Sequence, residues 1–528
     1  MRTHLFLFCV ACFFALTVTN AGIFLNDEWM TAAQLTQIGQ GHQVTYNEGT
    51  FGYFENGTVG TYMASRDNVL MYSLALPLLA LPLFWVTSLF TSPLLIPITM
   101  WTVCGTLAAV TAPRISSDCR GGLAVAILVA GMGSVIACPP VASDARAVIA
   151  IVVTNILLYG GFAVVTKRLV DLVMVEHLRW YAWLVTMACS TLLFWAGTCK
   201  DHMLVAFGVL CCCYFMLRYF RTANIVPAAI SAGLLLWVRA EVGIVVLLAF
   251  IGLLLVSRAP ARHIGVGSVV AGCSTVPFFF NNWLVSGNVL TPPFLMANHA
   301  NYTGDVVSHT ATFGLTTITN ISRYFTISDA LHLVGMPASG ALGLIVFGVA
   351  GIAVATMVRH RQCPIDRDLI TLVVFGVASF TYYFVFCGFL MHTDTGIMPD
   401  IRYTSAAYAP MTIAALAVIT RLEPLVPRRE IRTLMVGTLV AVPLVLLTLL
   451  TVPMFGASYP QFNHLINLLL MLVVVCTIVT KRPTGITMVA VILIVWQLGM
   501  SFVYGDIKIN GYPYLPIVDW LHHTLFVW

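Results

Sequence analysis

Long apolar runs recur along the whole chain, and short polar segments that hold most of the charges separate them. A helix needs about 20 predominantly apolar residues to cross the hydrocarbon core of a bilayer. A longer run, 69–112, has room for two helices. The remaining runs predict spanning helices at 4–25, 122–140, 147–166, 180–198, 203–217, 223–238, 242–257, 264–280, 338–357, 369–389, 403–420, 432–452, 464–480 and 484–504.

Pairs of basic residues, such as Lys167/Arg168, Arg218/Arg221 and Arg428/Arg429, mark every second junction between runs. The positive-inside rule places these junctions in the cytoplasm. The sides alternate consistently when 69–112 crosses an odd number of times, so one of its two helices is expected to be interfacial or re-entrant. The first run is interpreted as an uncleaved span with a cytoplasmic N-terminus. Most of the 26 Lys and Arg then lie inside, and the long loops 25–68 and 281–337 both lie outside.

Composition agrees with this interpretation. Hydrophobic residues make up 59% of the 528 residues and charged residues 9%, against about 25% charged in soluble domains. A soluble, a disordered and a nucleic-acid-binding protein are therefore excluded. Most of the 14 cysteines lie in apolar runs, where they act as small hydrophobic residues. The sequence predicts an all-α polytopic membrane protein with about 13–15 transmembrane helices.

The first candidate for chemistry is the adjacent pair Asp27-Glu28, directly after the first span. Two carboxylates at a membrane interface can bind a divalent cation or accept a proton from a hydroxyl group. Alternatively, they cap and charge the N-terminus of a helix. The following residues, 30–40, have an apolar pattern that predicts a short interfacial helix.

Two further candidates lie at span ends on the same predicted side. Asp201 and His202 follow one span, and Arg239 and Glu241 interrupt an otherwise apolar stretch. Asp201 is interpreted either as a solvated span end or as a partner of the first acidic pair. Arg239 either forms a local pair with Glu241 that closes a helical hairpin, or presents its forked donors to a phosphate.

The last candidate is Arg402-Tyr403, at an outer junction before another span. Arg402 is one of the few basic residues on the outer side, which makes it a candidate for binding an anionic ligand. The alternative is an ordinary interfacial anchor formed by an arginine and a tyrosine.

Taken in order, these motifs resemble the GT-C superfamily of membrane glycosyltransferases, with protein O-mannosyltransferases and aminoarabinose lipid A transferases as the nearer relatives. The acidic pair Asp27-Glu28 is followed by an interfacial segment that ends in Gly-Gln-Gly-His at 39–42. Arg239-Ala240-Glu241 is similar to an Arg-Pro-Glu element, with Ala240 in place of proline. Arg402-Tyr403 followed by Pro410 is similar to a late Arg-Tyr…Pro element.

The resemblance implies transfer of a sugar from a polyprenyl-phosphate carrier to a protein or lipid acceptor on the outer or lumenal face. It implies a catalytic group of Asp27, Glu28 and Asp201, with Asp27 as the base, and a donor-phosphate site of Arg239, Arg402 and Tyr403. His202, Glu241 and His42 are further candidates. A divalent cation is possible, and the sequence does not decide whether a metal is used.

The resemblance covers residues 1–420, which we interpret as a catalytic transmembrane module, followed by additional transmembrane helices in 421–528. Two other classes of function stay open from the residues alone. One is a polytopic secondary transporter, and the other is a non-catalytic membrane protein that handles lipids. The sequence specifies neither the sugar nor the acceptor.

Overall fold

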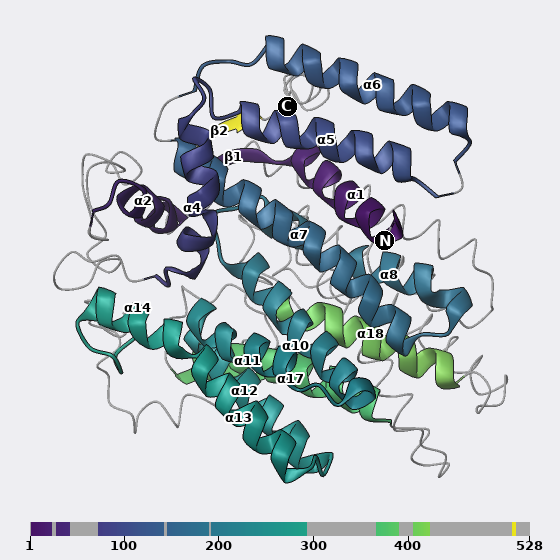
Figure 1. The fold of residues 1–528 in the computed structure, drawn as a ribbon, viewed down its shortest axis with the longest axis vertical. Coiled ribbons are helices and arrows are strands. Elements are labelled where there is room, and N and C mark those ends of the chain that lie inside the picture. Colours follow the sequence, from purple (N-terminus) through teal and green to yellow (C-terminus); the bar gives the residue numbers. More distant parts are fainter. Residues whose placement is uncertain are drawn as a thin grey trace, which may run out of the picture.

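The computed structural model describes residues 2–23, 28–42, 72–113, 115–141, 145–188, 192–292, 366–389, 405–422 and 509–513. Helices dominate this part of the chain (Figure 1). The first helices are α1 (Arg2–Val18), α2 (Glu28–Gly39), α4 (Ala75–Ser88), α5 (Leu95–Thr111), α6 (Ser117–Ile136), α7 (Ala145–Val173), α8 (Arg179–Ala188), preceded by the 3-10 turn η2 (Glu176–Leu178), and α9 (Leu192–Ala196). The later helices are α10 (His202–Thr222), α11 (Val226–Val238), α12 (Ala240–Val256), α13 (Ala261–Ser274), α14 (Val276–Ser286), α17 (Arg367–Phe389) and α18 (Ser405–Leu422).

The chain is a helical polytopic membrane protein, as its sequence predicts. Four stretches among the described residues are long and apolar enough to cross a bilayer: α6, α7, α10 and the consecutive pair α13–α14. Buried residues make up 72% of the most apolar window of α7 but only 22% of that of α6. Helix α7 is therefore central and α6 peripheral, at the outer edge of the bundle (Figure 1).

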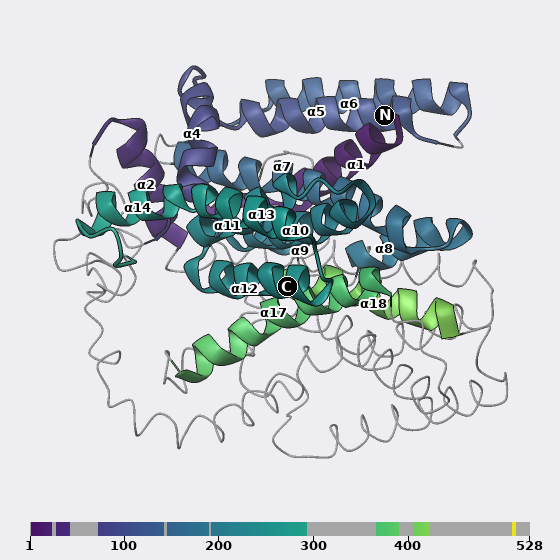
Figure 2. The ribbon, with the colours of Figure 1, turned by 60° about the horizontal axis from the view of Figure 1, so that its bottom comes forward.

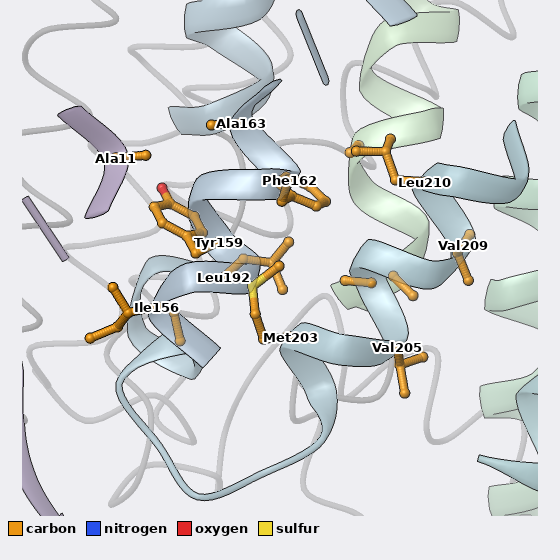
Figure 3. Packing of buried hydrophobic residues seen from close by; sticks show 14 of the residues in the cluster. Ala11, Ile156, Tyr159, Phe162, Ala163, Leu192, Met203, Val205, Val209 and Leu210 are labelled. Carbon is orange, nitrogen blue, oxygen red and sulfur yellow. The ribbon is translucent and has the colours of Figure 1, made fainter. Parts of the chain in front are cut away.

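The core forms around α7, because α1, α4 and α10 all pack against it. Tyr159 and Phe162 of α7 lie among Ala11 of α1, Leu192 of α9 and Met203 of α10 (Figure 3). Helices α11, α12 and α13 form a second group that joins the first through α10. This packing brings the two ends of α10 against segments that are distant in sequence.

In the predicted span 180–198 the structure describes α8 and α9, and residues 189–191 between them lie outside the described residues. Gly197 follows α9. A Cβ atom on Gly197 would lie 2.9 Å from the side chain of Thr19, so only glycine allows this close approach.

Two predicted boundaries need correction. The first helix ends at Val18 rather than at residue 25. The β-branched residues Val18 and Thr19, followed by Asn20, disfavour a helix at this point. The outer loop expected from residue 281 begins later, because α14 continues to Ser286 and ends at Gly287 with a φ of 70°. Within the range 69–112, two helices do form, and α4 is steeply inclined to α5 (Figure 2).

Strands were not predicted, yet β1 (Asn20–Ile23) pairs with β2 (Ile509–Pro513) in an antiparallel sheet. The pair Ala21–Tyr512 is in register, and an irregularity follows before Ile23 pairs with Ile509. Strand β1 packs against α7 and lies shortly before Glu28 in the sequence. A segment close to the C-terminus is thereby joined to the segment that leads into the first acidic pair.

Contacts at the end of α10 that carries Arg221 join residues that the sequence placed together in the cytoplasm. Arg221 forms an ion pair with Asp368 at the start of α17, and its Nη2 donates to the carbonyl oxygen of Leu172 at the end of α7, at 3.1 Å. Arg2 likewise donates to the carbonyl oxygen of Val110. These contacts join the ends of helices that are distant in sequence.

Candidate functional site

A cavity lies at the opposite end of α10, where several chain breaks meet. Its empty volume, open mouth included, is about 750 Å³. Thr31 of α2, Leu76 of α4 and Phe278 of α14 contribute to its walls. The charged part of the lining comes from two chain breaks, the turn at 200–201 before α10 and the residues around Arg239 between α11 and α12.

The break between α11 and α12 is a tight hairpin whose tip is Arg239. The backbone of Arg239 is extended, with φ −153° and ψ 107°, so one helix ends and the next begins at this residue. A Cβ atom on Gly243 would lie 2.3 Å from the Cα of Leu236, which only glycine avoids. Gly243 thus allows α12 to return directly along α11 and leaves the side chain of Arg239 at the cavity.

Arg239 contacts both residues of the predicted pair at the start of α10. Its Nε lies 3.4 Å from Oδ2 of Asp201, and their side chains are 17% and 23% exposed. Its Nη1 donates to Nδ1 of the buried His202 at 3.3 Å, and that nitrogen lies 4.0 Å from Oδ1 of Asp201. The hairpin predicted around Arg239 therefore exists, and its arginine reaches across to another helix.

Lys200 brings a second cation to the cavity wall, although it is almost fully buried. Its Nζ donates to the hydroxyl of Tyr72 at 3.1 Å and lies 4.7 Å from the centre of the same ring. Gln34 of α2 in turn donates to the carbonyl oxygen of Tyr72 at 2.8 Å. These contacts hold the ammonium group in one position. A fixed ammonium group can form a directed, charge-assisted hydrogen bond to an anion.

Asn281 connects three segments of the cavity wall. Its Oδ1 accepts from the backbone N–H of Leu74 at 2.8 Å and from the indole N–H of Trp237 at 3.3 Å. Ser73 donates to the carbonyl oxygen of Trp237 at 2.5 Å. These contacts fix the start of α4 against the α11–α12 hairpin, so the wall is built by hydrogen bonds as well as by packing.

Glu28 is fully buried at the start of α2, where its Oε2 accepts from the backbone N–H of Cys199 at 2.9 Å. This contact joins the first acidic pair to the turn that carries Asp201. Glu241 lines the cavity beside Arg239. His42 is exposed beyond the end of α2 and does not line the cavity.

Asp27, Arg402 and Tyr403 lie outside the described residues. The sequence analysis did not select Lys200, Tyr72 or Asn281 as site residues. Lys200 carried a signal, because it is a basic residue on the side where such residues are rare. Among the described residues, no group of three histidine, cysteine, aspartate or glutamate side chains is arranged to hold a metal ion.

No family model matches the chain. No curated protein matches it either. Its structure is similar to two crystal structures of ArnT from Cupriavidus metallidurans, both 14% identical in sequence. The structure of ArnT bound to undecaprenyl phosphate has a TM-score of 0.47, with 98% of this chain and 75% of that chain covered. The apo structure of ArnT has a TM-score of 0.41, with 97% of this chain and 75% of that chain covered.

Proposed function

We propose that this protein is a membrane glycosyltransferase that moves a sugar from a polyprenyl-phosphate carrier to an acceptor outside the membrane. The observation that carries the proposal is the cavity at the end of α10, which combines cationic groups with apolar walls. Lys200 and Arg239 line it together with Leu76, Leu236 and Phe278. A phosphate attached to a long hydrocarbon chain needs both kinds of surface at one place.

The reaction requires a base for the acceptor and positive charge for the leaving group. An acceptor oxygen or nitrogen attacks the anomeric carbon of the sugar, while the bond from that carbon to the phosphate oxygen breaks. We assign the proton of the acceptor to Asp27, and the electron pair of the broken bond stays on the polyprenyl phosphate. Arg239, with Arg402 and Tyr403, stabilises the charge of that phosphate.

Asp201 is assigned to the acceptor side of the same cavity. Its carboxylate also orients Arg239, because the guanidinium group lies between Asp201 and His202. An arginine presented in one orientation suits a phosphate, since its planar donors match phosphate oxygens two at a time. Glu241 lines the cavity beside this arginine.

The length of α10 supports a site at the membrane surface. About 20 residues separate Asp201 from Arg221, which corresponds to about 30 Å of helix and matches the thickness of the hydrocarbon core. The basic residues at the far end favour the cytoplasm for that end. The cavity then faces the outside of the cell or the lumen, where lipid-linked rather than nucleotide-linked sugars serve as donors.

The direct test is transfer from radiolabelled polyprenyl-phosphate sugars to lipid and protein acceptors, using membranes that contain the full-length protein. Wild type is expected to form labelled product, whereas Arg239→Gln is expected to lose it. Arg218→Gln is the matched control, because Arg218 is an exposed arginine at the far end of α10. Absence of product from wild type with every donor, or full transfer by Arg239→Gln, refutes the proposal.

A further inference from the structure

The turn that precedes Asp201 is held by side chains from two other helices. The carbonyl oxygens of Thr198 and Lys200 both accept from Nδ2 of Asn155 on α7, at 2.9 and 2.8 Å. From the other side, the N–H of Cys199 donates to Glu28 on α2. Three consecutive residues of the turn are therefore bonded through their backbones to buried side chains.

Asn155 is an unusual residue for its position. It is fully buried and lies within the longest apolar helix of the described chain. Its Oδ1 has no hydrogen-bond partner among the described residues, which carries a free-energy penalty in an apolar interior. A buried polar side chain is costly unless it is hydrogen-bonded. The two bonds from Nδ2 are what this side chain contributes.

One carboxamide nitrogen that binds two carbonyl oxygens two residues apart fixes the curvature of the turn. Lys200 and Asp201 leave this turn directly into the cavity, and Asp201 meets Arg239 there. A shift of the turn by about 1 Å would displace both charged groups together. Displacements of this size by mutations away from the reacting atoms can lower rates by about 10²-fold.

We propose that Asn155 is a positioning residue for the reaction: it sets the Thr198–Lys200 turn, and through it the placement of Lys200 and Asp201 in the cavity. Glu28 holds the opposite side of the same turn. The inference concerns the role of Asn155 in transfer and so rests on the proposed glycosyltransferase function. The geometry of the turn can nevertheless be tested without any transfer assay.

The test compares Asn155→Leu with the control Thr154→Val in the full-length protein. Leucine keeps the branched shape of asparagine and removes its donors. Thr154 is also buried, but its hydroxyl bonds only within α7, to the carbonyl oxygen of Ala150. The control therefore removes one buried hydrogen bond from the neighbouring position without contacting the turn.

Hydrogen–deuterium exchange is the first readout, measured by mass spectrometry on peptides that contain Cys199. We expect at least about a tenfold faster exchange in Asn155→Leu, because unclamped backbone opens more often. Thr154→Val is expected to exchange at the wild-type rate in the same peptide. Equal exchange in wild type and Asn155→Leu overturns the clamp, and it does so whether or not the protein transfers sugar.

Transfer kinetics are the second readout. We expect Asn155→Leu to lower kcat by about 10- to 100-fold, with a smaller change in the KM for the lipid-linked donor. A neutral aspartic acid can donate one hydrogen bond in place of two. We therefore expect the kcat of Asn155→Asp to lie between those of wild type and Asn155→Leu. A kcat within threefold of wild type in Asn155→Leu, or an equal loss in Thr154→Val, overturns the positioning role.

The two proposals fail in distinguishable ways. If wild type transfers no sugar, the glycosyltransferase proposal fails while the exchange experiment still decides the clamp. If Asn155→Leu does not fold, Asn155→Asp carries both readouts. Normal exchange and normal kcat in Asn155→Asp then refute the inference.

Discussion

The contact between Asp201 and Arg239 offers the sharpest test of the site. At 3.4 Å and an effective dielectric constant of about 20, the attraction between the two charges is about 5 kcal/mol. Both side chains are partly exposed, at 23% and 17%, so solvent screening reduces this value. Measured coupling energies for residues in direct contact are about 0.5–3 kcal/mol, and we expect about 1–3 kcal/mol here.

The perturbation is a double-mutant cycle of Asp201→Asn and Arg239→Gln, together with a charge-swapped protein, Asp201→Arg with Arg239→Asp. Stability is measured from the midpoint of unfolding in sodium dodecyl sulfate, and function from kcat/KM for sugar transfer. We expect the double variant to be less destabilised than the sum of the single variants. The swapped protein should regain part of the stability, because opposite charges again face each other.

Transfer should behave differently from stability in the same cycle. The swapped protein puts a carboxylate where the phosphate needs a guanidinium group, so we expect its kcat/KM to stay at least about 100-fold below wild type. If the swapped protein recovers transfer to within tenfold of wild type, the two residues form only a structural ion pair and Arg239 does not bind the phosphate. A coupling energy near zero would mean that the two side chains do not interact.

Further substitutions separate the remaining roles. Asp27→Asn should lower the transfer rate by about 10²–10⁴-fold and leave binding of the lipid-linked donor intact, because it removes the base; near-normal transfer would return Asp27 to a capping role. Glu28→Gln keeps an oxygen that can accept from the N–H of Cys199, so its transfer rate should stay within about tenfold of wild type. Glu28→Leu removes that oxygen and should lower the transfer rate far more. Equal losses in the two variants would contradict a positioning role for Glu28. Lys200→Met should raise the KM for the donor about tenfold or more in steady-state assays, and an unchanged KM would exclude Lys200 from the phosphate site. Gly243→Val should prevent accumulation of folded protein in size-exclusion profiles, because its side chain would collide with the backbone of α11.

Apolar runs predicted most of the helices among the described residues, because the length needed to cross a bilayer is set by its thickness. They failed at Asn281 and Asn282, which were interpreted as the start of a loop. In the structure both are buried within α14, and Asn281 binds the backbone of Leu74, 207 residues earlier. A polar residue indicates a loop only when no distant backbone group is available to it.

Among the described candidates, Glu28, Asp201 and Arg239 are linked by contacts at one end of α10, as charge placement led us to expect. The specific partners depend on packing that no local pattern contains. Nothing near Arg239 in the sequence indicates that it meets His202, and nothing near Asn155 indicates that the turn after α9 lies opposite. Glu28 was selected for its charge, whereas its contact with Cys199 depends on α2 packing beside α7.

The distribution of charge also bears on the choice between a transferase and a transporter. In the four long apolar stretches among the described residues, aspartate, glutamate, lysine, arginine and histidine occur only near the ends, as with Arg146 and Lys167 in α7. Transporters that couple to protons or ions place such groups near the middle of the bilayer. Here the chain breaks that carry Asp201 and Arg239 lie at helix ends. In the proposed reaction a lipid phosphate binds at the membrane surface, and an acceptor reaches it without crossing the membrane. The proposed chemistry therefore accounts for the gathering of these polar residues at helix ends, where a transporter would be expected to place them nearer the middle of its helices.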